Sequence, residues 1–107
     1  MNIENKLINF SKLGFLRKKY QSKKIVLAHG TFDFFHLGHL KHLKKSKIFG
    51  DILVVSLTSA KFVKKGIDRP VYNDIQRATI ISSLEFVDYV VIVNSLSGIE
   101  VIKNLKP

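Results

Sequence analysis

The chain has 107 residues, enough for one domain, and its 46% hydrophobic and 24% charged residues indicate a globular rather than a disordered protein. It has no cysteine, which excludes disulfides and thiolate chemistry, and no apolar run approaches the roughly 20 residues of a membrane helix. We therefore expect a cytoplasmic protein without a membrane partner. The formal charge of +10 favours polyanionic ligands, although scattered lysines are equally typical of a solvated surface.

The first half of the chain alternates helical and strand patterns. Apolar residues at near-helical spacing predict a helix within residues 5–20, and the continuous apolar run over 25–28 predicts a strand buried on both faces. A helical pattern follows over residues 37–49, and the run "DILVVSLT", residues 51–58, predicts a second buried strand.

The second half continues the alternation. A helical turn is expected within residues 59–64, followed by a loop containing Gly66 and Pro70. Asn73 or Asp74 can cap a helix that runs to about residue 85. The stretch "VDYVVIVN" predicts a third strand, and a last amphipathic helix spans about residues 97–105.

This order of elements predicts an α/β fold, a Rossmann-like parallel sheet with helices on both faces. Ligands of such sheets bind at the carboxyl ends of the strands. The stretch "GTFDFFHLGHLKHL" leaves the first predicted strand and enters a helix, so it lies at this end of the sheet.

This stretch has the composition of an anion site. A glycine turn that leads from a strand into a helix presents free N–H groups and a helix dipole to an anion. His36 and His39 are three residues apart, so their imidazoles can donate hydrogen bonds to one oxyanion, and Gly38 leaves room between them. Asp33 could hold the loop, orient a histidine or approach a metal.

A structural interpretation of the same residues stays open, because a histidine at a helix start is often a cap or a surface residue. Two histidines three apart can also share a metal ion, but zinc catalysis needs a third ligand and none is marked. We therefore expect no metal site built from protein residues alone. His29 and His42 are assigned to structure, at the strand end and on the outer helix face.

The segment "HGTFDFFHLGH" resembles the GxFDxxHxGH motif of the cytidylyltransferase-like nucleotidyltransferases, which include glycerol-3-phosphate cytidylyltransferase and the heptose-1-phosphate adenylyltransferases. The similarity continues through "GDILVVSLT" and "DRPVYNDIQRATIISSLEFVDYVVI" and is greatest to the sugar-phosphate branch. It implies the HUP-type version of the fold in a single domain, residues 1–107. Residues 1–22 would form a leading helix and residues 23–107 an incomplete nucleotide-binding core.

The resemblance also implies a reaction. An acceptor oxygen would attack the α-phosphate of CTP or ATP with Mg²⁺ present, pyrophosphate would leave, and CMP or AMP would pass to a phosphorylated sugar or polyol. His36, His39 and Arg77 would act on the phosphates, although Arg77 could instead be a solvated helix residue. Nucleotide contacts are implied for Gly30, Thr31, Phe32, Asp33, Gly38 and Lys65, of which Lys65 could equally belong to a solvated loop.

Members of the family usually continue past the "KP" with a further strand and an ISSTxxR segment that helps to bind the triphosphate. From the end at Pro107 we expect three strands, missing C-terminal strands and an open edge on the first strand, which favours a homo-oligomer or a complementing chain. The alternative function is a truncated, catalytically silent nucleotide-binding or assembly module. Only the charge favours a nucleic-acid partner, and no binding motif supports it.

Overall fold

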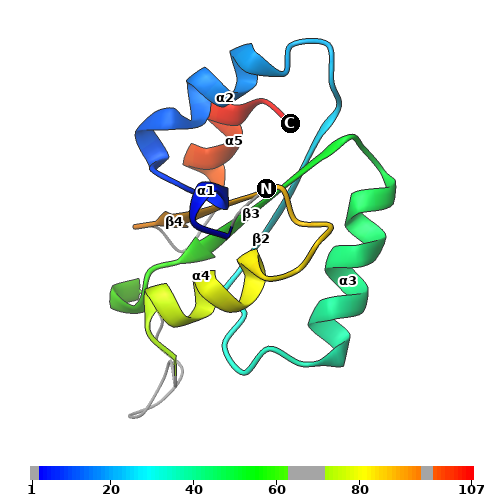
Figure 1. Cartoon of the computed structure of the whole chain (residues 1–107). Coiled ribbons are helices and arrows are strands. Elements are labelled where there is room, and N and C mark those ends of the chain that lie inside the picture. The colour runs from blue at the N-terminus through cyan, green and yellow to red at the C-terminus, as the bar shows by residue number, and fades with distance from the viewer. Residues whose placement is uncertain (1–2, 63–71, 95–97) are drawn as a thin grey trace.

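The computed structural model describes residues 3–62, 72–94 and 98–107, which form a parallel sheet with helices on both faces (Figure 1). The strand order in the sheet is β1-β4-β3-β2. This confirms the expected α/β, Rossmann-like fold. The strands are β1 (Leu7–Ile8), β2 (Ile25–Gly30), β3 (Ile52–Thr58) and β4 (Tyr89–Val93).

Two layers of helices enclose the sheet (Figure 1). One layer holds α3 (Leu37–Ile48) and α4 (Asp74–Ser82), and the other holds α2 (Leu13–Lys19) and α5 (Ile99–Leu105). No helix within the three described ranges is long and apolar enough to cross a membrane. The remaining short elements are α1 (Ile3–Lys6) and the 3₁₀ turns η1 (Phe10–Lys12) and η2 (Ala60–Phe62).

The central strand β3 carries the core on both of its faces. Leu53, Val55 and Leu57 belong to the apolar cluster on one side of the sheet, whereas Val54 belongs to the cluster on the other side. All four side chains are fully buried. Such two-sided burial explains why the strand reads as a continuous apolar run rather than an alternating one.

The prediction of a single helix within residues 5–20 is wrong in its first half. Leu7 and Ile8 form β1, which pairs in parallel with Val90 and Val91 of β4, and the helix α2 begins only at Leu13. The sheet therefore has four strands in the described residues rather than the expected three. The periodicity of apolar residues cannot reveal that the edge of β4 offers these two residues a backbone partner.

The strand β2 lies at the other edge of the sheet. It pairs with β3 over six residues, and in the described ranges no strand pairs with its outer side. The open edge expected for this strand is therefore present among these residues. Because β2 ends at Gly30, the histidine-containing loop directly follows this edge strand.

Candidate active site

The loop between β2 and α3 is held in an uncommon backbone conformation. Phe32 and Phe34 have φ angles of 52° and 46°, in the left-handed region that side-chain-bearing residues rarely adopt. Strain of this kind costs about 1 kcal/mol or more per residue and persists where the surroundings enforce it. The ring of Phe32 is buried in the core, and the ring of Phe34 packs edge-on against Tyr72. These aromatic contacts fix the path of the loop.

Two glycines make room for rings of the loop itself. A Cβ atom on Gly30 would lie 2.9 Å from Cε2 of Phe32, and one on Gly38 would lie 2.8 Å from Cε1 of His36. The room that Gly38 leaves is therefore taken up by the imidazole of His36. The contact of Gly30 and Gly38 with a nucleotide stays a prediction.

His36 and His39 together cap the start of α3. His36 is the N-cap residue, and its Nδ1 accepts a hydrogen bond from the N–H of Gly38 at 3.0 Å. In return the N–H of His36 donates to Nδ1 of His39 at 3.3 Å. The two rings stack with centroids 3.9 Å apart. The pair thus forms a capping box with imidazoles where Ser or Thr and Glu are usual.

These bonds decide which nitrogen of each ring carries the proton. A nitrogen that accepts a hydrogen bond has no proton of its own, so each neutral ring is protonated on Nε2. Both Nε2–H groups can donate, and the stacked rings hold them at the N-terminus of a 12-residue helix, whose dipole favours an anion. The ring of His39 is further fixed by edge contact with Phe32, at 5.4 Å between centroids.

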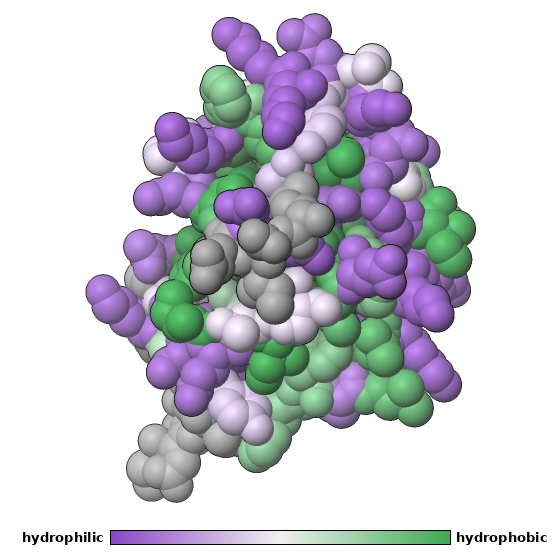
Figure 2. Space-filling model, in the orientation of Figure 1, coloured by the Kyte–Doolittle hydropathy of each residue, from purple (hydrophilic) through white to green (hydrophobic). Residues whose placement is uncertain are grey.

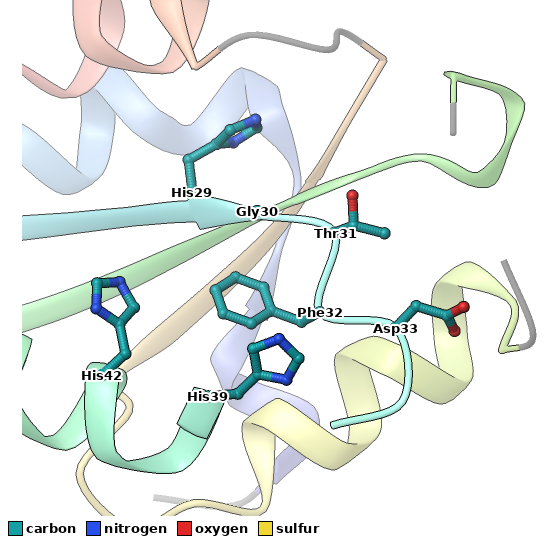
Figure 3. Close-up of a pocket in the computed structure, with 7 residues that line it drawn as sticks. All are labelled: His29, Gly30, Thr31, Phe32, Asp33, His39 and His42. Atoms are coloured by element: carbon teal, nitrogen blue, oxygen red, sulfur yellow. The ribbon is translucent and has the colours of Figure 1, made fainter. Parts of the chain in front are cut away.

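A cavity of about 590 Å³ opens at the carboxyl end of β2 (Figure 3). Figure 3 shows the side chains of His29 and Thr31 on one side of the strand end and the rings of Phe32 and His39 on the other. Five of the predicted site residues therefore meet here, and His36 adjoins them through its stacked ring. The residues that line the cavity are His29, Gly30, Thr31, Phe32, Asp33, His39 and His42.

His29 and His42 line the cavity although the sequence interpretation had assigned them to structure. His42 lies on the cavity wall and not only on the outer face of α3. Its spacing from His36 and His39, three residues at each step, was the signal that could have indicated this. His29 precedes Gly30, the last residue of β2, so its predicted position at the strand end is confirmed. The sequence interpretation did not predict that His29 also lines the cavity.

Asp33 holds the loop, which is one of the three roles that the sequence left open. Its Oδ1 accepts a hydrogen bond from the N–H of Tyr72 at 3.0 Å. This bond ties the loop to the segment directly before α4, and the contact between Phe34 and Tyr72 reinforces it. The carboxylate also lines the cavity.

Arg77 lies away from the cavity wall. The alternative of a solvated arginine is wrong, because its side chain is 0% exposed. Its guanidinium donates to the carbonyl oxygens of Thr31 at 2.9 Å and Thr58 at 2.8 Å, and to the carboxylate of Asp74 at 2.7 Å. Arg77 therefore clamps the carboxyl ends of β2 and β3 to the start of α4. Lys65 lies outside the described residues.

The fold and this site together define a class of protein. It is a Rossmann-like α/β domain whose polar cavity, at the carboxyl ends of parallel strands, carries fixed imidazoles and a helix N-terminus suited to phosphate groups.

Comparison with known proteins identifies the family. The model of the cytidylyltransferase-like family matches residues 27–107, and the chain belongs to this family. The chain is 44% identical to the bifunctional protein HldE of Campylobacter jejuni strain RM1221 over 109 aligned residues, which cover 100% of the chain and 23% of that protein. It is 42% identical to the bifunctional protein HldE of Geobacter metallireducens, covering 84% of the chain and 19% of that protein.

The chain thus spans about a fifth of the length of the curated relatives it matches. A solved structure agrees with the assignment. The crystal structure of the lipopolysaccharide core biosynthesis protein from Thermoplasma volcanium superimposes with a TM-score of 0.71 at 32% sequence identity, covering 79% of this chain and 70% of that one.

Proposed function

We propose that this chain transfers CMP or AMP from CTP or ATP to a phosphorylated sugar or polyol and releases pyrophosphate. The observation that carries the proposal is the stacked pair His36 and His39, whose Nε2–H groups are held at the helix N-terminus beside the cavity. Membership of the cytidylyltransferase-like family supports the reaction class. A sugar acceptor agrees with the neighbour described as a lipopolysaccharide core biosynthesis protein, since such cores are oligosaccharides.

The reaction is an in-line displacement at the α-phosphorus. A phosphate oxygen of the acceptor forms a bond to this phosphorus, and the bond to the leaving pyrophosphate breaks with its electron pair. The attacking oxygen is already anionic, so no general base is required. Negative charge grows on the oxygens of the α-phosphate and on the leaving oxygen, where the Nε2–H groups of His36 and His39 donate hydrogen bonds.

The remaining site residues position these groups. Thr31, anchored through its carbonyl oxygen to Arg77, presents its side chain at the strand end. Arg77 acts as a positioning residue in this proposal, because its guanidinium is fully buried below the loop. We also propose a contact of Lys65 with the nucleotide, as the family resemblance implies.

Mg²⁺ fits this site as an ion carried by the triphosphate. The described residues contain no group of three His, Asp or Glu side chains that could hold a metal ion, but Asp33 provides one carboxylate on the cavity wall. Mg²⁺ is often bound by one or two carboxylates together with substrate phosphates. When bound there, it would neutralise triphosphate charge, and among the described residues of the cavity wall Asp33 would hold it.

The first prediction tests the role of the imidazoles. His39→Ala should lower kcat about 10²- to 10³-fold, the usual effect of removing one hydrogen-bond donor to the transition state. Pyrophosphate release is measured on the full chain with CTP and with ATP, each paired with sn-glycerol 3-phosphate and with an aldoheptose 1-phosphate. The control Lys23→Gln changes an exposed residue before the start of β2 and should leave kcat unchanged.

Calorimetry separates the remaining outcomes. A folded chain that binds CTP or ATP but forms no product with any acceptor is the catalytically silent nucleotide-binding module. A folded chain that shows neither binding nor turnover contradicts the proposed function.

A further inference from the structure

The sheet face below α2 and α5 becomes polar at the end where the cavity lies. Val54 and Val91 belong to the apolar cluster on this face. The next two positions of β3 on the same face are Ser56 and Thr58, of which Ser56 is 0% and Thr58 3% exposed. His29 of β2 pairs with Ser56 in the sheet register. Three polar side chains therefore replace the apolar layer at the carboxyl ends of the two strands.

These groups hold the imidazole of His29 in one orientation. Its Nδ1 lies 2.6 Å from Oγ of Ser56, and its Nε2 lies 3.4 Å from Oγ1 of Thr58. The chain also approaches the ring closely at Gly98, where an added Cβ atom would lie 3.3 Å from Cγ of His29. The ring is therefore held by two hydroxyl groups of β3 and lies against the N-cap residue of α5.

Packing alone gives no reason for this cluster. Apolar side chains at positions 29, 56 and 58 would extend the core without the cost of burying polar groups. The polar groups instead coincide with the place where His29 reaches the wall of the cavity. Imidazole and hydroxyl groups can each donate and accept hydrogen bonds, which is the chemistry that sugar and polyol hydroxyls require.

We propose that His29, oriented by the short contact of its Nδ1 with Ser56, forms part of the acceptor site, where a hydroxyl group of the phosphorylated sugar or polyol takes the place of Thr58 at Nε2, whose contact is long at 3.4 Å. This inference rests on the proposed function. An in-line displacement places the attacking and the leaving oxygen on opposite sides of the α-phosphorus. His39 and the N-terminus of α3 lie on one side of the strand end, where they favour the leaving pyrophosphate, and His29 lies on the other side (Figure 3).

The kinetic test compares two substitutions of the same residue in the full chain. His29→Phe keeps a ring but removes both nitrogens, so it should raise the KM for the acceptor about tenfold or more, because a group that bonds a substrate hydroxyl is lost. The KM for CTP or ATP should stay within about twofold, since no nucleotide contact changes. His29→Gln restores a donor and an acceptor and should recover part of the acceptor KM.

A purely structural role of His29 predicts a different result. Thermal unfolding would shift for both variants while the two KM values stayed equal to those of the wild type, and this overturns the inference. A rise of the nucleotide KM alone overturns it as well, because His29 would then contact the nucleotide. In both cases product still forms, so the proposed function survives.

A binding measurement on the wild-type chain avoids the risk that a variant fails to fold. The four histidines give four sets of imidazole NMR signals, which single substitutions assign. Adding sn-glycerol 3-phosphate or an aldoheptose 1-phosphate to the complex with a non-hydrolysable CTP or ATP analogue should shift the His29 signals. The nucleotide analogue alone should shift those of His36 and His39. Acceptor binding that leaves His29 unshifted, or no acceptor binding at all, overturns the inference, whereas unshifted His36 and His39 contradict the proposed function.

Discussion

At the scale of single residues, the complete burial of Arg77 favours a positioning role over direct contact with the substrate. Removing it takes the guanidinium donor from the carbonyl oxygens of Thr31 and Thr58, and it takes the cation from the carboxylate of Asp74, which keeps bonds from Ser59 and Ala60. Arg77→Ala should therefore lower the free energy of unfolding by about 3 kcal/mol, because a fully buried guanidinium with three hydrogen bonds is lost and the side chain of its partner Asp74 is only 30% exposed. Urea denaturation followed by circular dichroism measures this change.

A matched control uses an exposed ion pair. Lys103 and Glu100 are 3.7 Å apart and have 68% and 60% exposed side chains, so Lys103→Ala should change stability by less than about 1 kcal/mol. If Arg77→Ala instead kept full stability and lost nucleotide affinity, Arg77 would be a phosphate ligand after all.

The burial of Arg77 was partly readable from the sequence. It precedes Ala78 by one residue and Ile81 by four, and both are buried on the inner face of α4. Its charge favoured solvent or phosphate in the sequence interpretation. No local pattern reveals the two carbonyl oxygens that it binds, because Thr31 directly follows β2 and Thr58 ends β3, both distant in sequence. The paired histidines were easier to predict, since their spacing and their place after a strand are local features.

At the scale of secondary structure, the start of α3 depends on a residue that is also proposed to act in catalysis. His36→Asn should keep the cap, because Asn is among the best N-cap residues, whereas His36→Ala should lower the free energy of unfolding by about 1 kcal/mol. Both variants lack the imidazole and should lose turnover to a similar extent. Unfolding in urea and pyrophosphate release are measured on both.

This comparison separates the two roles of His36. If His36→Asn retained wild-type turnover, the imidazole would serve only as a cap. If His36→Ala were as stable as the wild type, the hydrogen bond from the N–H of Gly38 would contribute nothing measurable to folding.

The elements that were predicted well from the sequence are long enough for their buried face to produce a recognisable pattern of apolar residues. The three longer strands and α3, α4 and α5 each lie where an apolar run or a helical spacing placed them. β1 has only two residues and forms through hydrogen bonds to β4, so its existence depends on a tertiary partner. Phe15 shows the same limit, because it is one of the apolar residues of the helical pattern and is nevertheless 70% exposed.

At the scale of the whole molecule, the formal charge of +10 acts on any triphosphate that approaches the site. Figure 2 shows hydrophilic side chains across much of the visible surface, most densely over its upper part. The effect of a charge on binding falls with distance over a Debye length of about 10 Å at 0.1 M salt. Exposed lysines near the cavity should therefore steer the nucleotide, and distant ones should not.

Two pairs of exposed lysines make this testable. Lys41 and Lys44 lie on α3 beside the cavity residue His42, whereas Lys18 and Lys23 lie before β2, which extends about 20 Å from them to the cavity end. In the wild type, kcat/KM for CTP or ATP should fall about threefold or more between about 0.05 and 0.3 M NaCl, as expected for electrostatic steering. Replacing Lys41 and Lys44 by Gln should flatten this slope, and replacing Lys18 and Lys23 should leave it unchanged. Slopes that flatten equally in both double variants would mean that the net charge acts without regard to position. Slopes that stay at the wild-type value in both would mean that these lysines are only solvated surface residues.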